Sequence, residues 1–442
     1  MPRANSSLVV AGIGGLFVLE VLFFTYLRNS LGPYWSPVVL YAISLALTAL
    51  AARAVLGCRF EWPTVPNRPV VARFALGAGL VAASWLLTGP VISKLISQYP
   101  AATIGPRSDI VPALQVYVTR FLAADEVVYQ PITMLGYTFL PNYAPLQWLP
   151  FVGAELAGLD YRWWAFLALL TGLLVYQGQL ARLALPKGEW GLKAVLPLLV
   201  LHFFVLSSKD VFRFTVEGLI VGYYCVLVAS TLSGKVWLQV LGLTLCLLSR
   251  FSLALWVPLY GLLLLWENPR RGWLTAGLTL AAGLLLFGPF LLHDPTIFLR
   301  AQLENLNIAE GEWAHMHIGQ AKPVHLFNGV GLASWFFDMP GTLVERITRL
   351  QQVQFGACTA VVLVSGGLFW RFRHRFDPRL AALLSLKAYL ATFYALLIIP
   401  YVYLASVSLF TSLFVVLIVS RRAPFLVSFA RPAAPATQAS AD

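Results

Sequence analysis

Residues 8–27 read LVVAGIGGLFVLEVLFFTYL, and Glu20 is the only charged side chain in this run. An α-helix of about 20 apolar residues is long enough to cross the hydrocarbon core of a bilayer. The composition points the same way, because 59% of the 442 residues are hydrophobic and only 11% are charged, whereas a soluble domain has roughly 25% charged residues. We therefore predict an all-α, polytopic membrane protein.

Similar apolar runs recur along the chain and predict about twelve transmembrane helices. In the region 236–266, Arg250 favours two short helices, although one bent helix would fit the same residues. The expected spans are 8–27, 37–57, 73–95, 162–182, 191–207, 213–231, 236–250, 252–266, 272–292, 353–370, 379–399 and 402–420.

These spans divide the chain into four parts. Residues 1–72 hold an N-terminal transmembrane hairpin and a cytoplasmic loop, residues 73–350 a central module, and residues 351–425 the C-terminal transmembrane helices. Residues 426–442 are expected to form a disordered cytoplasmic tail, because the chain is rich in Ala, Pro, Ser and Thr at its end. The first span has no small-residue cleavage site behind it, so we expect it to be a retained helix.

The net charge of +12 is best explained by membrane topology. If the N-terminus is inside, most Lys and Arg residues fall in cytoplasmic loops, as the positive-inside rule requires. We therefore expect a multi-pass protein of the plasma (inner) membrane with both termini in the cytoplasm. The long loops 97–161 and 293–350 then lie on the extracytoplasmic face and carry short membrane-lying helices. A lipid bilayer is the expected partner of the basic residues, and nucleic acid is not expected.

Asp109 is the strongest candidate for chemistry in the first long loop. It lies beyond the third span and precedes the amphipathic run 114–122, which is expected to lie along the membrane. A carboxylate in this place could take the proton of an attacking hydroxyl, so Asp109 is a candidate general base. The alternative is that Asp109 caps the helix that follows it. Asp125 and Glu126 are the second choice for the catalytic role, and a solvated turn is their alternative.

Cations at the outer edge of the membrane are candidates for binding the phosphate of a lipid-linked donor, which lies at headgroup depth. Alternatively, Lys209, Arg213 and Arg250 neutralise nearby carboxylates and lipid headgroups. The candidate phosphate-binding residues are Arg107, Lys209, Arg213 and Arg250.

Other polar residues of this face are candidates for substrate binding, namely Tyr129, Glu217, His293 and His325. Together with His325, the pair His315 and His317 gives a weak metal signal, and no complete ligand set is recognised. No metal site and no cofactor are therefore assigned, and a divalent metal ion stays an open alternative. Within the spans, Glu20 is either satisfied by a neighbouring helix or involved in ligand binding, and Lys387 is expected to extend towards the inner side.

The arrangement of spans and loops resembles the GT-C superfamily of integral-membrane glycosyltransferases, which use polyprenyl-phosphate sugars. The motifs that carry the resemblance lie in the first loop of the 73–350 module, and they are similar to the bacterial branch that includes polyprenyl-phosphate-mannose-dependent mannosyltransferases. They are Ser108-Asp109, Val128-Tyr129-Gln130, and Asn142-Tyr143-Ala144-Pro145-Leu146 before Leu149-Pro150.

The resemblance implies a cell-envelope hexosyltransferase. It would move a sugar from a polyprenyl-phosphate donor to an extracytoplasmic glycan or lipid acceptor, with Asp109 as the general base. Two features depart from the family pattern, because the acidic residue follows the third span and the turn at 209–213 lacks the usual Gly-Gln. The alternative is a non-enzymatic flippase or transporter of lipid-linked saccharides. Such a protein would be expected to carry its polar residues within broken spans.

The predicted topology can be tested with single cysteines and an impermeant thiol reagent. Cysteines introduced at Asn142 and Gln320 should be labelled from outside the cell, whereas a cysteine introduced at Asn268 should not be. The reverse pattern of labelling would place both long loops in the cytoplasm.

Overall fold

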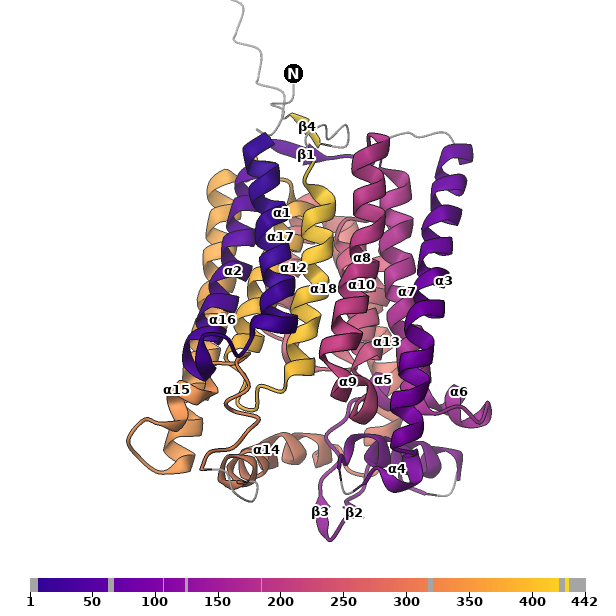
Figure 1. The fold of residues 1–442 in the computed structure, drawn as a ribbon, viewed down its shortest axis with the longest axis vertical. Coiled ribbons are helices and arrows are strands. Elements are labelled where there is room, and N and C mark those ends of the chain that lie inside the picture. The colour runs from indigo at the N-terminus through magenta and orange to yellow at the C-terminus, as the bar shows by residue number, and fades with distance from the viewer. Residues whose placement is uncertain are drawn as a thin grey trace, which may run out of the picture.

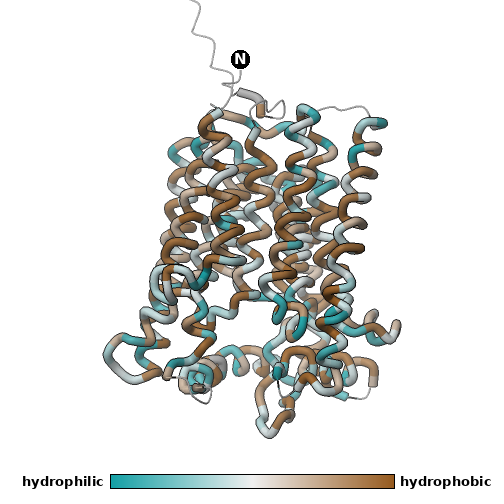
Figure 2. The backbone as a smooth tube through the Cα atoms, viewed as in Figure 1, coloured by the Kyte–Doolittle hydropathy of each residue, from teal (hydrophilic) through white to brown (hydrophobic). Residues whose placement is uncertain are grey.

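The computed structural model describes residues 7–62, 67–105, 107–123, 126–183, 185–316, 321–420 and 426–428. The described chain is almost entirely helical, and its long helices stand side by side as one bundle (Figure 1). Hydrophobic residues cover most of the length of these helices, while hydrophilic residues collect at the two ends of the bundle (Figure 2). This distribution is that of a protein surrounded by lipid, and it confirms the predicted all-α membrane class.

Each expected span contains a helix of the bundle. Seven of the described helices are long and apolar enough to cross a membrane, and the total of twelve spans stays a prediction. The long helices are α1 (Ser7–Leu22, continued by the π-turn Phe23–Leu27), α2 (Gly32–Val55), α3 (Asn67–Gln98), α7 (Tyr161–Arg182), α8 (Lys187–Ser207), α13 (Pro269–Phe287) and α16 (Leu343–Phe372). The shorter helices are α10 (Glu217–Thr231), α11 (Val236–Leu247), α12 (Val257–Glu267), α17 (Pro378–Ala395) and α18 (Val402–Ile418).

The structure changes the expected boundary of the sixth span. The region expected as a turn before the sixth span contains a short helix, α9 (Lys209–Phe214), and α10 begins only at Glu217. Thr215 causes the break, because its hydroxyl donates to the Val211 carbonyl at 2.7 Å and accepts from the Glu217 N–H at 3.2 Å. Between α11 and α12 the chain forms only a 3₁₀ turn (Phe251–Leu253), so the region that contains Arg250 is divided, as expected.

Both long loops lie at the same end of the bundle, which we call the loop end (Figure 1). The first loop contains α4 (Ile110–Leu122), the hairpin β2 (Ile132–Met134) and β3 (Tyr137–Phe139), α5 (Pro145–Trp148) and α6 (Phe151–Leu156). The second contains α14 (Ile297–Ala314) and α15 (Ala333–Phe337). Helices α4 and α14 lie across the bundle axis beneath the long helices, so these loops cover the end of the bundle.

A buried aromatic cluster gives the first loop a core of its own. Tyr129 is 2% exposed, and its hydroxyl donates to the Tyr143 carbonyl and accepts from the Trp148 indole N–H. The ring of Tyr117 stacks on that of Trp148 with centroids 5.8 Å apart, and Phe290 also contacts Trp148. Buried aromatic side chains with satisfied polar groups contribute most of the packing energy of such a small unit. The loop is therefore an ordered structure.

A small sheet forms at the opposite end of the bundle. Strand β1 (Cys58–Phe60) pairs antiparallel with β4 (Leu426–Ser428), and Leu426 is 3% exposed. The predicted disordered tail 426–442 was therefore wrong at its start, because pairing with β1 satisfies the backbone groups of these three residues. Residues 429–442 lie outside the described part of the chain.

The N-terminal hairpin packs against the last two helices of the chain, with α2 against α17 and α1 against α18. An ion pair joins them deep in the bundle, because the Lys387 ammonium lies 2.6 Å from Glu20 Oε1 and both side chains are almost fully buried. Lys387 also donates to Ser408 Oγ at 2.8 Å, and Ser412 Oγ donates to the second carboxylate oxygen of Glu20 at 2.6 Å. The two charges satisfy each other, so Lys387 does not extend to the inner surface as expected.

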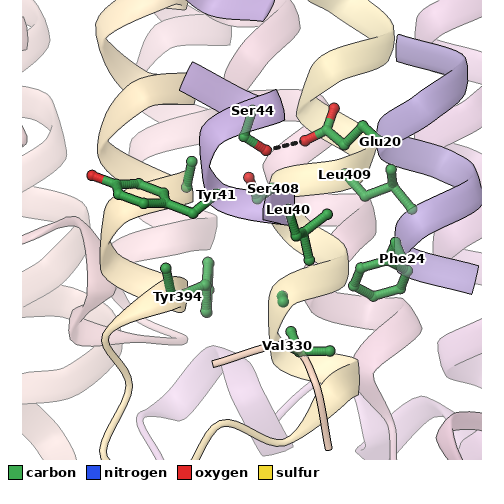
Figure 3. Close-up of a pocket in the computed structure, with 12 residues that line it drawn as sticks. Glu20, Phe24, Leu40, Tyr41, Ser44, Val330, Tyr394, Ser408 and Leu409 are labelled. Carbon is green, nitrogen blue, oxygen red and sulfur yellow. Dashed lines mark hydrogen bonds between the residues drawn. The ribbon is translucent and has the colours of Figure 1, made fainter. Parts of the chain in front are cut away.

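The Glu20 carboxylate borders a cavity of about 30 Å³ that is also lined by Ser44 and Ser408 (Figure 3). Ser44 donates a hydrogen bond to Glu20 there. The cavity is about large enough for one water molecule. Its other walls include Val330 of the second loop and Tyr394 at the end of α17.

Replacement of Lys387 by Met should leave the Glu20 carboxylate buried without its partner. Breaking one side of a buried ion pair costs roughly 3–5 kcal/mol, so the variant should unfold at a clearly lower temperature in detergent. The double variant Glu20→Gln/Lys387→Met should recover most of this loss, because no charge is left unpaired. Wild-type stability of Lys387→Met would show that the pair does not hold the hairpin.

Candidate functional site

Asp109 lies at the start of α4, but it does not cap the helix. Its backbone is helical, with φ −84° and ψ −12°, and its carboxylate accepts no hydrogen bond from the first turn. One carboxylate oxygen instead accepts from the Tyr137 hydroxyl at 2.6 Å. Because Tyr137 belongs to the β2–β3 hairpin, Asp109 is oriented by the loop that covers it. The Asp109 side chain therefore does not act as the helix cap.

Residues 135 and 136 place Tyr137 opposite Asp109. The two strands of the hairpin pair Ile132 with Phe139 and Met134 with Tyr137, and the two turn residues Leu135 and Gly136 have φ of 53° and 85°. Two consecutive positive φ values are typical of a type I′ turn, whose twist matches that of the strands.

Three tyrosines interact with Asp109: Tyr137 and Tyr143 of the first loop, and Tyr401, which precedes α18. Burial raises the pKa of Tyr143, and the negative charge of Asp109 raises it further. The pKa of Tyr401 is raised by burial first, and then by the charges of Glu312 and Asp109. Tyr401 therefore lies within electrostatic reach of both carboxylates, which belong to different loops. All three phenols stay protonated at neutral pH and can donate hydrogen bonds, because the pKa of Tyr137 is raised as well.

Glu312 is the second carboxylate of the site, and it comes from α14. The Tyr401 hydroxyl donates to Glu312 Oε2 at 3.2 Å, and His325 Nε2 lies 3.4 Å from the same oxygen and 3.0 Å from the Glu312 carbonyl. His325 thus contacts Glu312, and its predicted role in substrate binding stays a prediction. Glu312 had no catalytic assignment, because only the fold of the second loop brings it near Asp109.

Helix α9 is fixed beside Asp109 by two hydrogen bonds to its last carbonyls. Ser108 Oγ donates to the Phe214 carbonyl at 2.8 Å, and Arg162 Nη1 donates to the Arg213 carbonyl at 2.6 Å. Arg162 is itself held by Asp160, with Nε and Nη2 at 2.8 and 2.6 Å from the two carboxylate oxygens. These contacts satisfy carbonyl groups that a helix end would leave unpaired.

Helix α9 carries two cations, Lys209 and Arg213, and neither has a buried acidic partner among the residues that the structure describes. Arg213 contacts Asp210 at 3.4 Å, but the side chain of Asp210 is 76% exposed, and an ion pair in water neutralises little. Its Nη2 also donates to Gln98 Oε1 at 3.0 Å. Lys209 and Arg107 are both exposed. Arg107, Lys209 and Arg213 therefore remain candidates for binding a phosphate group.

Arg250 has a different environment from the other candidate cations. Its guanidinium forms two parallel hydrogen bonds with the Glu217 carboxylate, one of them 2.7 Å long. The Glu217 side chain is only 3% exposed and that of Arg250 16%. Because the two side chains are buried against each other, neither residue is retained as a direct ligand of the donor or the acceptor. The charge of Arg250 opposes the rise in the pKa of Tyr143, so the pair lies within electrostatic reach of that tyrosine.

Other candidates from the sequence are not brought to Asp109. Tyr129 belongs to the aromatic core of the first loop. Glu126 is half-exposed and lies 4.0 Å from Arg120, and His293 is exposed and follows the 3₁₀ turn Gly288–Leu291. Asp125 and His317 lie outside the described residues. Among the residues that the structure describes, no group of three or more His, Cys, Asp and Glu side chains could hold a metal ion.

An apolar groove leads from the membrane region to the loop end. It lies between α11, α12 and α13 and has a volume of about 480 Å³. Its walls are Leu247, Leu248, Val257, Leu264, Thr275, Phe287 and residues near them. At the loop end the Leu248 carbonyl accepts from Leu146 N at 2.8 Å, and Arg250 follows two residues later. A hydrocarbon chain in the groove would thus end below the first loop.

Comparison of the chain with known protein families, with curated proteins and with solved structures finds no match.

Three of the four cations predicted to bind phosphate should respond differently to alanine. Arg250→Ala leaves a buried Glu217 without a partner and should lower the free energy of unfolding by roughly 3–5 kcal/mol. Lys209→Ala removes an exposed charge, and Arg213→Ala removes a partly buried one whose acidic partner is exposed, so each should change it by less than about 1 kcal/mol. Thermal unfolding in detergent measures the difference. Equal stability of all three variants would contradict the ion pair.

Proposed function

We propose that this protein is an integral-membrane glycosyltransferase. It transfers a sugar from a polyprenyl-phosphate donor to a glycan or lipid acceptor at the extracytoplasmic face of the plasma membrane, and both of its termini are cytoplasmic. The observation that carries the proposal is the Asp109 carboxylate, which is free of any capping bond, is oriented by Tyr137 and follows Ser108, whose hydroxyl donates to the last carbonyl of α9. The resemblance of the loop motifs to the GT-C superfamily supports the same reaction.

In the proposed reaction Asp109 is the general base. The acceptor hydroxyl attacks the anomeric carbon of the donor sugar while its proton passes to the Asp109 carboxylate. The bond between that carbon and the phosphate oxygen breaks, and the electron pair leaves with the polyprenyl phosphate. The charge that develops on the phosphate is stabilised by cations, which lowers the need for an acid at the leaving group. Lys209, Arg213 and Arg107 are the residues proposed for this role.

The phenols around Asp109 suit a sugar substrate. Tyr137 holds the carboxylate in one orientation, which reduces the entropy lost when the acceptor hydroxyl reaches it. Tyr401 and His325 are already engaged with Glu312, so the second carboxylate is held in place and could accept hydrogen bonds from sugar hydroxyls. Two carboxylates, several phenols and one imidazole supply both donors and acceptors, as recognition of a carbohydrate requires.

The apolar groove supports a lipid-linked donor. A polyprenyl chain is a hydrocarbon, and the groove between α11, α12 and α13 offers it an apolar path to the loop end. With the tail in this groove, the phosphate would lie below the first loop, at the depth of the lipid headgroups.

The alternative is a non-enzymatic flippase or transporter, and the buried polar cluster around Glu20 and Lys387 is the observation in its favour. Ionisable residues within membrane helices often mark transport paths. In this chain, however, both charges are paired and hydrogen-bonded to serines, and the cavity beside them has a volume of only about 30 Å³. We therefore favour the enzyme.

Replacement of Asp109 by Asn should test the general base. The amide keeps the size of the side chain and can still accept the hydrogen bond from Tyr137, but it cannot take a proton from the acceptor. We expect transfer from a polyprenyl-phosphate sugar in liposomes to fall by roughly 10²–10⁴-fold, with thermal stability almost unchanged.

Glu126→Gln is the matched control, because Glu126 lies in the same loop, is half-exposed and does not contact Asp109. It should keep near-normal turnover. Normal turnover in Asp109→Asn would remove the proposed proton acceptor, and collapse of turnover in Glu126→Gln alone would move the base to the second acidic pair.

A further inference from the structure

A cluster of arginines lies at the end of the bundle opposite the loop end, where α12 and α16 end and α13 and α17 begin. The two helical hairpins are in contact there, because the Trp266 ring of α12 lies 5.5 Å from the Trp370 ring of α16. In and beside the two turns that join these helices, the sequence has six arginines and only two acidic residues, Glu267 and Asp377, so four positive charges are in excess. The arginines of this cluster, which we call the arginine corner, are Arg270, Arg271, Arg371, Arg373, Arg375 and Arg379.

Both acidic residues of the corner already have partners. Glu267 Oε1 accepts from Arg379 Nε at 2.9 Å and from Arg271 Nη1 at 3.2 Å. Asp377 is 5% exposed and accepts from two backbone N–H groups at 3.0 and 2.8 Å. Neither carboxylate is therefore available to neutralise the other arginines. The exposed arginines of the corner are Arg270, Arg371 and Arg375.

Arg373 forms no ion pair among the described residues, yet its guanidinium is held in place by two tryptophans. It lies 4.5 Å from the centroid of the Trp370 ring and 5.7 Å from that of Trp266. Its Nη1 also donates to the Trp370 carbonyl at 3.1 Å. A cation–π contact orients a guanidinium without neutralising it, so the other N–H groups of Arg373 can donate to an anion.

The tryptophans of the corner face the lipid. Trp266 and Trp370 are 44% and 59% exposed, and Trp273, in the second turn of α13, is 69% exposed. Helices α13 and α16 stand at the edge of the bundle, because only 6% and 11% of their apolar segments are buried inside it. Tryptophans gather where the hydrocarbon meets the headgroups. The corner therefore lies at headgroup depth and can be reached from the surrounding lipid.

The positive-inside rule accounts for the number of these charges, but it does not require them to be fixed. In the corner, three guanidiniums from different segments are ordered around the end of one helix. Arg373 packs on Trp266, and Arg271 and Arg379 bind the next residue of α12, Glu267. Guanidiniums in fixed positions suit a phosphate group, which they bind through pairs of parallel hydrogen bonds.

We propose that the arginine corner binds the headgroup of an anionic phospholipid. Its phosphate oxygens accept from Arg373 and from the exposed arginines beside it, while Trp266 and Trp370 contact the start of the acyl chains. The occupant is a lipid, because the exposed tryptophans place these cations against the bilayer. The bound lipid joins the α12–α13 hairpin to the α16–α17 hairpin. The inference does not depend on the proposed reaction, since the corner and Asp109 lie at opposite ends of the bundle.

The test compares phosphatidylglycerol with phosphatidylcholine as a ligand of the purified full chain in neutral detergent. A ligand that binds only the folded state raises the unfolding temperature, so phosphatidylglycerol should raise it and phosphatidylcholine should not. Arg373→Gln breaks no ion pair. It should increase about tenfold the concentration of phosphatidylglycerol that gives the same rise. Arg371→Gln, at an exposed position, is a second variant with the same expected direction, and it decides the matter if Arg373→Gln unfolds early without lipid.

Arg68→Gln is the matched control. Arg68 is an exposed arginine at the same end of the bundle, on α3, which packs against α7 and α8, and the variant should respond to phosphatidylglycerol like the wild type. An equal response of the wild type to both lipids would overturn the inference, as would an unchanged response of Arg373→Gln and Arg371→Gln. An equal loss in Arg68→Gln would show general attraction of charges in place of a site. Stabilisation by inorganic phosphate to the same extent would show an anion site that does not select a lipid.

Discussion

A charge inside hydrocarbon must find a partner, and this constraint organises the bundle. Glu20 on α1 and Lys387 on α17 lie far apart in the sequence, yet each is almost fully buried against the other. Their serine neighbours on α2 and α18 supply the remaining hydrogen bonds. Because an unpaired charge at this depth would cost several kcal/mol, the four helices have one favourable arrangement. The N-terminal hairpin is fixed on the C-terminal helices in this way.

The same constraint shapes the floor of the candidate site. Glu217 begins α10 and Arg250 follows α11, and their closed pair joins two helices directly below the first loop. Three other basic residues of this face lie nearer to the solvent. Lys209 and Arg107 are exposed, and the acidic partner of Arg213 is exposed. The two buried ion pairs thus hold helices together, whereas Lys209 and Arg107 lie at the surface of the loop end.

Two ordered loops bring the acidic groups of the site together. The first loop is held by the aromatic cluster of Tyr117, Tyr129 and Trp148, and the hairpin that it carries presents Tyr137 to Asp109. The second loop presents Glu312, with His325 and Tyr401 attached to it. Rigid loops suit a reaction whose proton acceptor must be placed within hydrogen-bond distance of a hydroxyl. The proposed transfer reaction needs this precision, whereas a structural loop would not.

The sequence by itself determined the membrane class, the helical spans and the candidate role of Asp109. Apolar runs and isolated charges are local properties, and the hydrophobic length of a helix does not depend on its neighbours. Only the tertiary structure decided which charges are paired, because Glu20 with Lys387 and Glu217 with Arg250 are contacts between distant segments. It also assigned Tyr129 to a core and brought Glu312 and Asp109, from two different loops, within electrostatic reach of Tyr401. A sequence gives the kind of side chain at each position, but burial and the distance between two groups depend on how the helices pack.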